Sequence, residues 1–176
     1  RTTITSVMDD SFRRTLRYSK SQREGKTRRE IEVTFDYDSK EASYFESGRL
    51  VSKVALPGSA FDPLAIAYFF RLGELKPNSE RILPTCDGKK FREVKVRSGR
   101  VEKVRVPAGT FQALGTVPEM ENLSGVFKKS PDGILRVWYS NDLRRLPVKI
   151  SSKVVVGSFT ARLTGSKGLI PAKPRP

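Results

Sequence analysis

The residues that could carry out chemistry are few. The chain of 176 residues has no histidine and one cysteine, Cys86. Histidine is the commonest general base and metal ligand, so its absence removes the usual Ser or Cys triads and most metal sites. Cys86 lies beside a predicted turn at Asp87-Gly88, where an inert small residue is expected more often than a nucleophile. We therefore predict no catalytic residues, no metal site and no cofactor, and a protein that is not an enzyme.

Acidic residues occur as pairs in predicted turns and loops. The pairs are Asp9 with Asp10, Asp36 with Asp38, and Glu119 with Glu121. Paired carboxylates can serve acid–base or glycosidase chemistry when a cleft raises the pKa of one of them. Nothing in the sequence places these pairs in a cleft, and they lack the glycine and terminal glutamate of a calcium loop. An enzyme built on them would have to work without histidine.

Cations outnumber anions, with 34 Lys and Arg against 19 Asp and Glu and a net charge of +15. They gather in residues 13–29, 89–105, 128–129 and 144–153. Such a surface attracts polyanions in a salt-sensitive way, but it can equally be a solvated outer face that discourages edge pairing. Nucleic acid is disfavoured as the partner, because the basic groups lack interleaved exposed aromatics and no recognised motif is present.

Trp138 is the most distinctive aromatic residue. Strand periodicity places it with Arg136 on one face of a predicted strand over residues 134–140, shortly before Arg144. A tryptophan beside an arginine can stack on a sugar or a base, or hold a cation within the protein. It can also be a half-buried anchor, with the following turn held by its own charges. The structural interpretation is favoured.

One segment has a helical pattern. Asp62 suits an N-cap and Pro63 the first helical position. Residues 64–70 contain no charge and are apolar on nearly every side, which predicts a short buried helix. Leu64, Tyr68 and Phe69 are candidates to line an apolar cavity. The alternative, that the helix plugs the sheet and forms the core, is favoured.

The rest of the chain alternates between strand and turn signals. The clearest strand covers residues 28–37, where apolar and polar side chains alternate with a period of two. Ser98-Gly99 is predicted to be a hairpin turn between strands at 89–97 and 101–106. About ten to twelve short strands predict a mainly β fold, a curved antiparallel meander wrapping one short apolar helix as a half-barrel or open barrel. Residues 1–165 are expected to form a single β domain, followed by a Pro- and Lys-rich tail over 166–176.

Several motifs occur in one order and together resemble a known family. They are Phe61-Asp62-Pro63-Leu64 with Tyr68 and Arg71, Val106-Pro107-Ala108-Gly109-Thr110-Phe111, Ser130-Pro131-Asp132-Gly133, Trp138-Tyr139-Ser140-Asn141-Asp142 with Arg144-Arg145-Leu146-Pro147-Val148, and Val156-Gly157-Ser158. This series resembles an uncharacterised family of bacterial envelope proteins, one of the numbered domains of unknown function, typically exported behind a signal peptide. The resemblance covers roughly residues 1–165.

The resemblance implies a location in the periplasm or cell envelope and a curved sheet like that of lipoprotein carriers of the LolA and LolB type. Those carriers hold acyl chains in their concavity. Members usually have further β segments before the equivalent of Arg1, so an N-terminal part of the domain is expected to be missing. The expected partner is a lipid or lipoprotein bound as an amphipathic ligand, and the alternative is a scaffolding module for a protein or an anionic envelope polymer. No transmembrane segment is predicted. The candidate ligand-binding residues are Leu64, Tyr68, Phe69, Arg136, Trp138 and Arg144.

Overall fold

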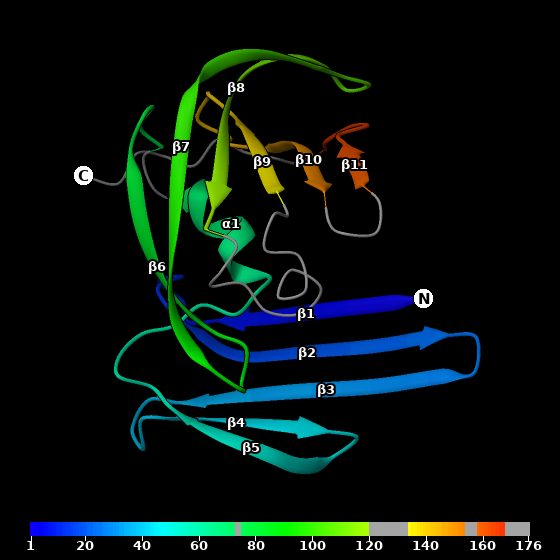
Figure 1. The fold of residues 1–176 in the computed structure, drawn as a ribbon, viewed down its shortest axis with the longest axis vertical. Coiled ribbons are helices and arrows are strands. Elements are labelled where there is room, and N and C mark those ends of the chain that lie inside the picture. The colour runs from blue at the N-terminus through cyan, green and yellow to red at the C-terminus, as the bar shows by residue number, and fades with distance from the viewer. Residues whose placement is uncertain (73–74, 120–133, 154–157, 168–176) are drawn as a thin grey trace. The chain divides into compact units, whose positions relative to one another are not determined.

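The computed structural model describes residues 1–72, 75–119, 134–153 and 158–167, which form eleven strands and one helix (Figure 1). The first sheet contains β1 (Thr2–Met8), β2 (Thr15–Glu24), β3 (Thr27–Asp36), β4 (Glu41–Glu46) and β5 (Arg49–Ala55). The second contains β6 (Glu80–Cys86), β7 (Phe91–Val106), β8 (Gly109–Pro118), β9 (Ile134–Ser140), β10 (Pro147–Lys153) and β11 (Ser158–Arg162). The helix is α1 (Ala65–Leu72). The predicted strand at 124–129 lies outside the described residues.

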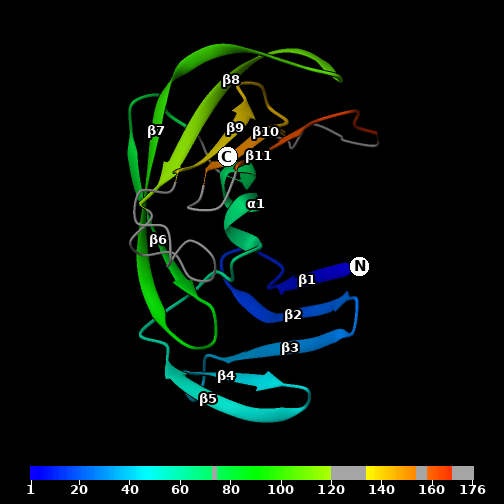
Figure 2. The ribbon, with the colours of Figure 1, turned by 45° about the vertical axis from the view of Figure 1, so that its right-hand side comes forward.

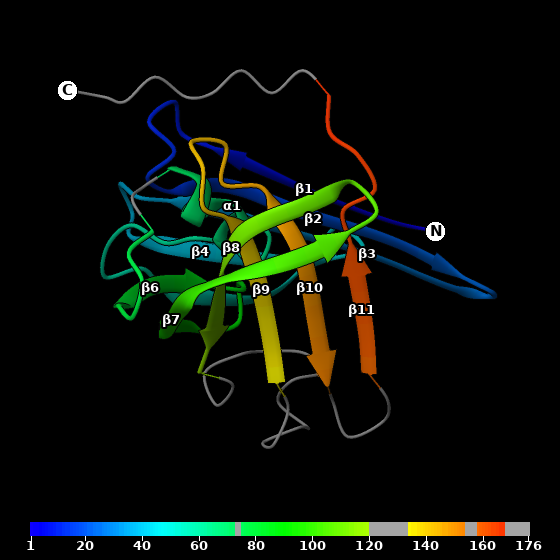
Figure 3. The same ribbon diagram turned by 90° about the horizontal axis from the view of Figure 1, so that it is seen from above.

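Both sheets are meanders in which each strand pairs with its neighbour in sequence. The order is β1-β2-β3-β4-β5 in the first sheet and β11-β10-β9-β8-β7-β6 in the second. The registers within the first sheet, and from β7 to β11 in the second, are antiparallel. Figure 3 shows β9, β10 and β11 side by side. The prediction of a mainly β, antiparallel meander with one short helix is confirmed.

The chain divides into two compact units. The first unit contains Arg1–Phe69 and Leu83–Glu93, and the second contains Phe70–Ile82 and Val94–Pro176. The chain therefore passes from one unit to the other within α1, β6 and β7. The predicted tail at 166–176 lies outside the described residues from residue 168 onward.

The core of the first unit is built on one face of β3 and β4. Val33 and Phe35 are buried there, and Ala42, Tyr44 and Cys86 pack with them. Side chains alternate across a strand, so the residues between them point to the other face. The predicted period of two in this strand is confirmed.

Both the backbone conformation and the surrounding side chains favour glycine at position 88. Its φ is +82°, and an added Cβ would lie 2.8 Å from Val33 Cγ2 and 3.0 Å from Tyr44 Cδ2. Gly48 has a similar φ of +77° but nothing within 4 Å of an added Cβ. Gly48→Ala therefore measures the backbone cost alone, on the order of 1 kcal/mol, whereas Gly88→Ala should cost about 2–3 kcal/mol because it also overpacks the core. Urea unfolding of both variants checks this. Equal losses of unfolding free energy would show that Val33 and Tyr44 move to accommodate the added methyl group.

Helix α1 begins as the sequence predicts. Asp62 is its cap: the carboxylate Oδ1 accepts hydrogen bonds from the backbone N–H of Leu64 at 2.7 Å and of Ala65 at 3.0 Å. The expectation of burial on nearly every side is wrong at Tyr68, which is 48% exposed. Tyrosine tolerates this position because its ring is apolar while its hydroxyl can stay in water.

The prediction of a hairpin turn at Ser98-Gly99 is wrong, because β7 continues through these residues as one strand of 16 residues (Figure 2). The register shifts there: Ser98 lies opposite Thr116 and Val101 opposite Leu114, which leaves one extra residue on β7. This is a β-bulge, a common reason for a glycine within a strand. Ser98 N–H donates to Ser79 O at 2.9 Å and Asn78 N–H donates to Gly99 O at 3.0 Å. These bonds hold the segment extended.

Candidate functional site

Trp138, on β9, is part of the core of the second unit. It is 8% exposed and packs with Val104, Val106, Leu146 and Val148. Its indole N–H donates a hydrogen bond to the carboxylate of Glu102 on β7. A tryptophan this buried, with its one polar atom satisfied, is an anchor of the fold, which agrees with the interpretation favoured from the sequence.

Cations surround the Trp138 ring. The Nζ atom of Lys149 lies 4.4 Å from the ring centroid, and the guanidinium carbon of Arg136 lies 5.5 Å from it. Both distances are within the range of cation–π attraction. The register explains the position of Lys149, which is directly opposite Trp138 on β10, and Arg162 of β11 is opposite Lys149 in turn. One row across three strands thus contains Trp138 followed by two basic residues.

A hollow of about 260 Å³ lies beside this row. Its lining includes two glycines from neighbouring strands, Gly99 at the bulge of β7 and Gly115 on β8. A Cβ added to Gly115 would lie 3.2 Å from Trp138 Nε1 and 3.5 Å from Arg136 Cδ. A side chain at Gly115 would therefore press on the Trp138 indole and fill space beside Arg136, so glycine keeps the hollow open.

The charges at the hollow are mainly positive. Arg100 and Arg136 line it, and among the described residues the only carboxylate in the lining belongs to Glu102. That carboxylate already accepts the Trp138 indole hydrogen bond. Guanidinium groups bind phosphate and carboxylate oxygens through paired N–H donors, so two of them at one hollow suit an anion. We call Arg100, Arg136 and Lys149, with Gly99 and Gly115, the basic hollow.

Arg144 serves the turn that follows β9. Its Nε and Nη2 atoms donate to Asp142 Oδ2 at 3.0 and 2.6 Å, and Ser140 Oγ donates to Asp142 Oδ1 at 2.8 Å. Burial raises the pKa of Asp142, but the hydrogen bonds and the positive charge of Arg144 outweigh burial and leave this pKa below its usual value. The turn is held by its own charges, as the structural interpretation expects.

The helix candidates lie in the first unit and the strand candidates in the second. Phe69 packs edge-on against Phe61 with ring centroids 5.0 Å apart, Leu64 is half-buried, and Tyr68 is exposed. Within the second unit, helix residue Phe70 contacts Tyr139, with centroids 5.4 Å apart. Tyr139 points to the opposite face of β9 from Trp138, so Trp138 is not the β9 residue that meets the helix. Of the six predicted residues, the structure brings together Arg136 and Trp138.

Sequence reasoning missed Arg100, Glu102 and Lys149 as neighbours of this pair, and it missed the glycines of the hollow. The available signal was Gly99 and Gly115 within segments that otherwise alternate like strands. A glycine inside a strand often marks a bulge or a close approach. The sequence alone does not say which strands those glycines face.

Cys86 is fully buried, and burial raises the pKa of its thiol. A buried, protonated thiol reacts slowly because the thiolate is the reactive form. We expect labelling by a disulfide reagent at pH 8 to be about a hundredfold or more slower in native buffer than in denaturing urea, since it must await opening of the structure. Equal rates in the two conditions would contradict the burial of Cys86. The measurement needs no variant, because this is the only cysteine of the chain.

Among the described residues, no group of three or more His, Cys, Asp or Glu side chains is arranged to hold a metal ion. Over the same residues, no helix has the length and apolar character needed to cross a membrane.

The fold and this site define a mainly antiparallel β protein with a basic hollow on its second sheet. The family model described as "Protein of unknown function (DUF3108)" matches residues 1–164, so the chain belongs to this family. Neither the curated proteins nor the solved structures gave a significant match. The resemblance to a family of unknown function is therefore confirmed, while the envelope location and the likeness to lipoprotein carriers stay predictions.

Proposed function

We propose that this protein is a non-enzymatic binding protein of the bacterial cell envelope that holds an anionic polymer at the basic hollow. The observation that carries the proposal is the convergence of Arg100 and Arg136 on one hollow, beside Lys149 and above the glycines of β7 and β8. Repeated phosphate or carboxylate groups match guanidinium donors in both charge and hydrogen-bond geometry. The net charge of +15 would speed encounter with such a polymer.

The residues that line the hollows favour a surface-bound polymer over an enclosed acyl chain. Hollows of about 540, 470 and 260 Å³ each lie within a single unit. Polar and charged residues contribute to the lining of each of these hollows. An acyl chain needs an apolar lining, whereas an anionic polymer needs cations with access to solvent. Both Arg100 and Arg136 are exposed.

Binding of a short inorganic polyphosphate, measured by calorimetry at several salt concentrations, tests the proposal. The double variant Arg100→Gln/Arg136→Gln should bind about tenfold or more weakly, because charge-assisted hydrogen bonds are lost in addition to general attraction. Its affinity should also depend less steeply on salt, since fewer counterions are released.

Arg13→Gln/Arg49→Gln is the matched control. It removes the same charge from two exposed positions of the first unit. We expect it to weaken binding only slightly. If both double variants weaken binding equally, the affinity depends only on the net charge of the protein, and the basic hollow is not the binding site.

An amphipathic lipid is the second candidate ligand. It is favoured by the apolar residues Ala108, Phe111 and Leu163, which are only partly buried and pack in the same cluster as Trp138. The anionic head group of the lipid would bind Arg100 and Arg136, and its acyl chain would pack on these apolar residues. Native mass spectrometry of gently purified protein should show a co-purifying lipid under this hypothesis. If several preparations show only the mass of the polypeptide, without bound lipid, the hypothesis is contradicted.

The envelope location is part of the proposal and has its own test. Fractionation of cells that express the untagged full-length protein should place it with periplasmic or envelope markers. Recovery with cytoplasmic markers would overturn the location while leaving the binding experiment interpretable.

A further inference from the structure

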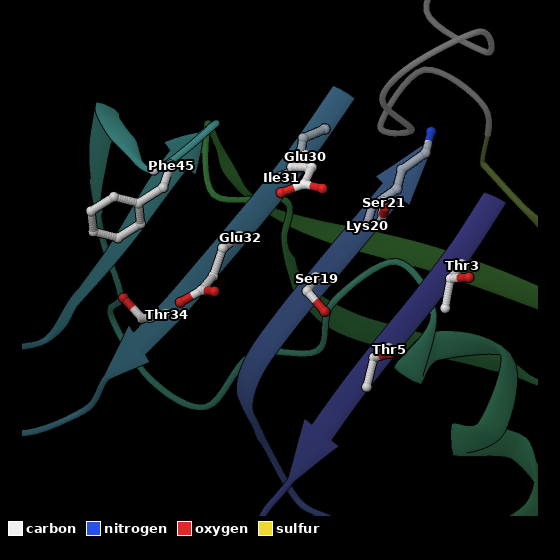
Figure 4. A pocket seen from close by; sticks show the side chains of 11 residues that line it. Thr3, Thr5, Ser19, Lys20, Ser21, Glu30, Ile31, Glu32, Thr34 and Phe45 are labelled. Carbon is white, nitrogen blue, oxygen red and sulfur yellow. The ribbon is translucent and has the colours of Figure 1, made fainter. Parts of the chain in front are cut away.

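The five-stranded sheet has a hollow of its own, separate in residues and in chemistry from the basic hollow. It has a volume of about 540 Å³, and its lining comes from β1 to β4 and the turn after β4. Figure 4 shows the lining side chains on neighbouring strands, with Thr3 and Thr5 on β1, Ser19 on β2, Glu32 on β3 and Phe45 on β4. All of these residues belong to the first unit.

The strand register arranges these side chains in rows across the sheet. Thr5 lies opposite Ser19, Ser19 opposite Glu32, and Glu32 opposite Phe45. A shorter row contains Thr3, Ser21 and Glu30. Partners in directly opposite positions point to the same face, so hydroxyls, carboxylates and one aromatic ring form a continuous strip perpendicular to the strands. We call these two rows the hydroxyl strip.

The chemistry of the hydroxyl strip differs from that of a typical core or anion site. The serine and threonine hydroxyls both donate and accept hydrogen bonds, and the carboxylates of Glu30 and Glu32 accept them. Arg17 forms an ion pair with Glu32 at 2.6 Å, which holds that carboxylate in place. Lys20 is the only cation among the described residues of the lining, and strand alternation directs it away from Ser19 and Ser21.

This lining discriminates between classes of ligand. A polyanion would meet two carboxylates, and an acyl chain would leave the hydroxyls without partners. A sugar chain presents many hydroxyls that both donate and accept, together with apolar ring faces that pack on an aromatic side chain. Phe45 is half-buried at the end of the longer row, so part of its surface is accessible for such packing.

We propose that the hydroxyl strip is a binding site for an uncharged saccharide chain. Glu30, Glu32 and the hydroxyls of β1 and β2 accept and donate hydrogen bonds to the sugar hydroxyls, and a sugar ring packs on Phe45. The proposal is independent of the anionic-polymer site, which lies on different strands. The protein would thereby contact a charged and an uncharged polymer through two separate surfaces.

The test uses chitotetraose and cellotetraose as probes, with ligand-observed NMR to detect contact and calorimetry to measure affinity. Wild-type protein should bind at least one of them. Phe45→Ala should weaken binding about fivefold or more through loss of ring packing, and Glu32→Gln should weaken it as well. Ser19→Val removes a single hydroxyl from the middle of the strip and should also weaken binding. This variant keeps the test decisive if Phe45→Ala does not fold.

The controls remove an aromatic ring and a carboxylate elsewhere in the first unit. Tyr68→Ala removes an exposed aromatic ring from α1, and Glu46→Gln removes a carboxylate of β4 that points to the opposite face from Phe45. Both should bind the probes as wild type does. Arg100→Gln/Arg136→Gln should also keep saccharide binding, which separates this proposal from that of the basic hollow. Absence of binding to both probes, or equal losses in the strip variants and the controls, would overturn the inference.

Discussion

Replacement of Asp62 by alanine is expected to lower the free energy of unfolding by about 3–5 kcal/mol, measured by urea denaturation. Asp62 is fully buried and its carboxylate accepts four hydrogen bonds. Two come from backbone N–H groups at the start of α1, and two come from the hydroxyls of Ser6 on β1 and Thr15 on β2. Alanine removes the helix cap and leaves the buried Thr15 hydroxyl without its acceptor.

Asp62→Asn separates the two roles of this side chain. The asparagine oxygen can still cap the helix, but the second carboxylate oxygen becomes an amide donor facing two hydroxyls. We expect a loss between those of wild type and Asp62→Ala. Asp38→Ala, at an exposed aspartate of the same unit, is the control and should change stability by less than about 0.5 kcal/mol. If Asp62→Ala unfolds at the same urea concentration as this control, the buried network contributes nothing to stability.

Trp138→Ala should cost about 3–5 kcal/mol, because it removes the largest side chain from the core cluster of the second unit. It also leaves the Glu102 carboxylate without its indole donor and the Lys149 and Arg136 cations without their ring. Polyphosphate binding should weaken along with stability, since Arg136 loses a surface that positions it. Lost binding with unchanged stability would contradict the assignment of Trp138 as an anchor.

Trp138→Phe tests the polar contact by itself. Phenylalanine keeps an aromatic ring for packing and for the cations but cannot donate to Glu102. We expect a loss of about 1–2 kcal/mol, smaller than that of the alanine variant. Phe159→Ala, at a ring that is 55% exposed on β11, is the control and should leave both stability and binding near wild type. A Phe variant as unstable as the Ala variant would place most of the energy in the indole hydrogen bond.

Local patterns in the sequence were enough for many individual elements. The cap at Asp62 and the start of α1 were predictable because the signals lie within a few consecutive residues. The buried face of β3 was predictable because alternation reports which side of a strand is apolar. The same reasoning failed at Ser98-Gly99, where a turn and a bulge have the same residue types and only the hydrogen bonds to neighbouring strands distinguish them.

The candidate sites depended on contacts that are distant in sequence. Arg136 and Trp138 were predictable as a pair because they are two residues apart on one strand. Glu102 is 36 residues from Trp138, and Ser6 is 56 residues from Asp62. The hydroxyl strip could not be predicted from the sequence, because single polar and aromatic residues on four strands carry no signal until the register aligns them.

The sequence by itself therefore determined the class of protein: a basic, mainly antiparallel β chain with one capped helix and no histidine. The tertiary structure decided which residues share a surface. The physical reason is that strand register, including the extra residue at the bulge of β7, sets the neighbours across a sheet, and a shift of one residue moves every side chain to the other face. The basic hollow and the hydroxyl strip are both products of register.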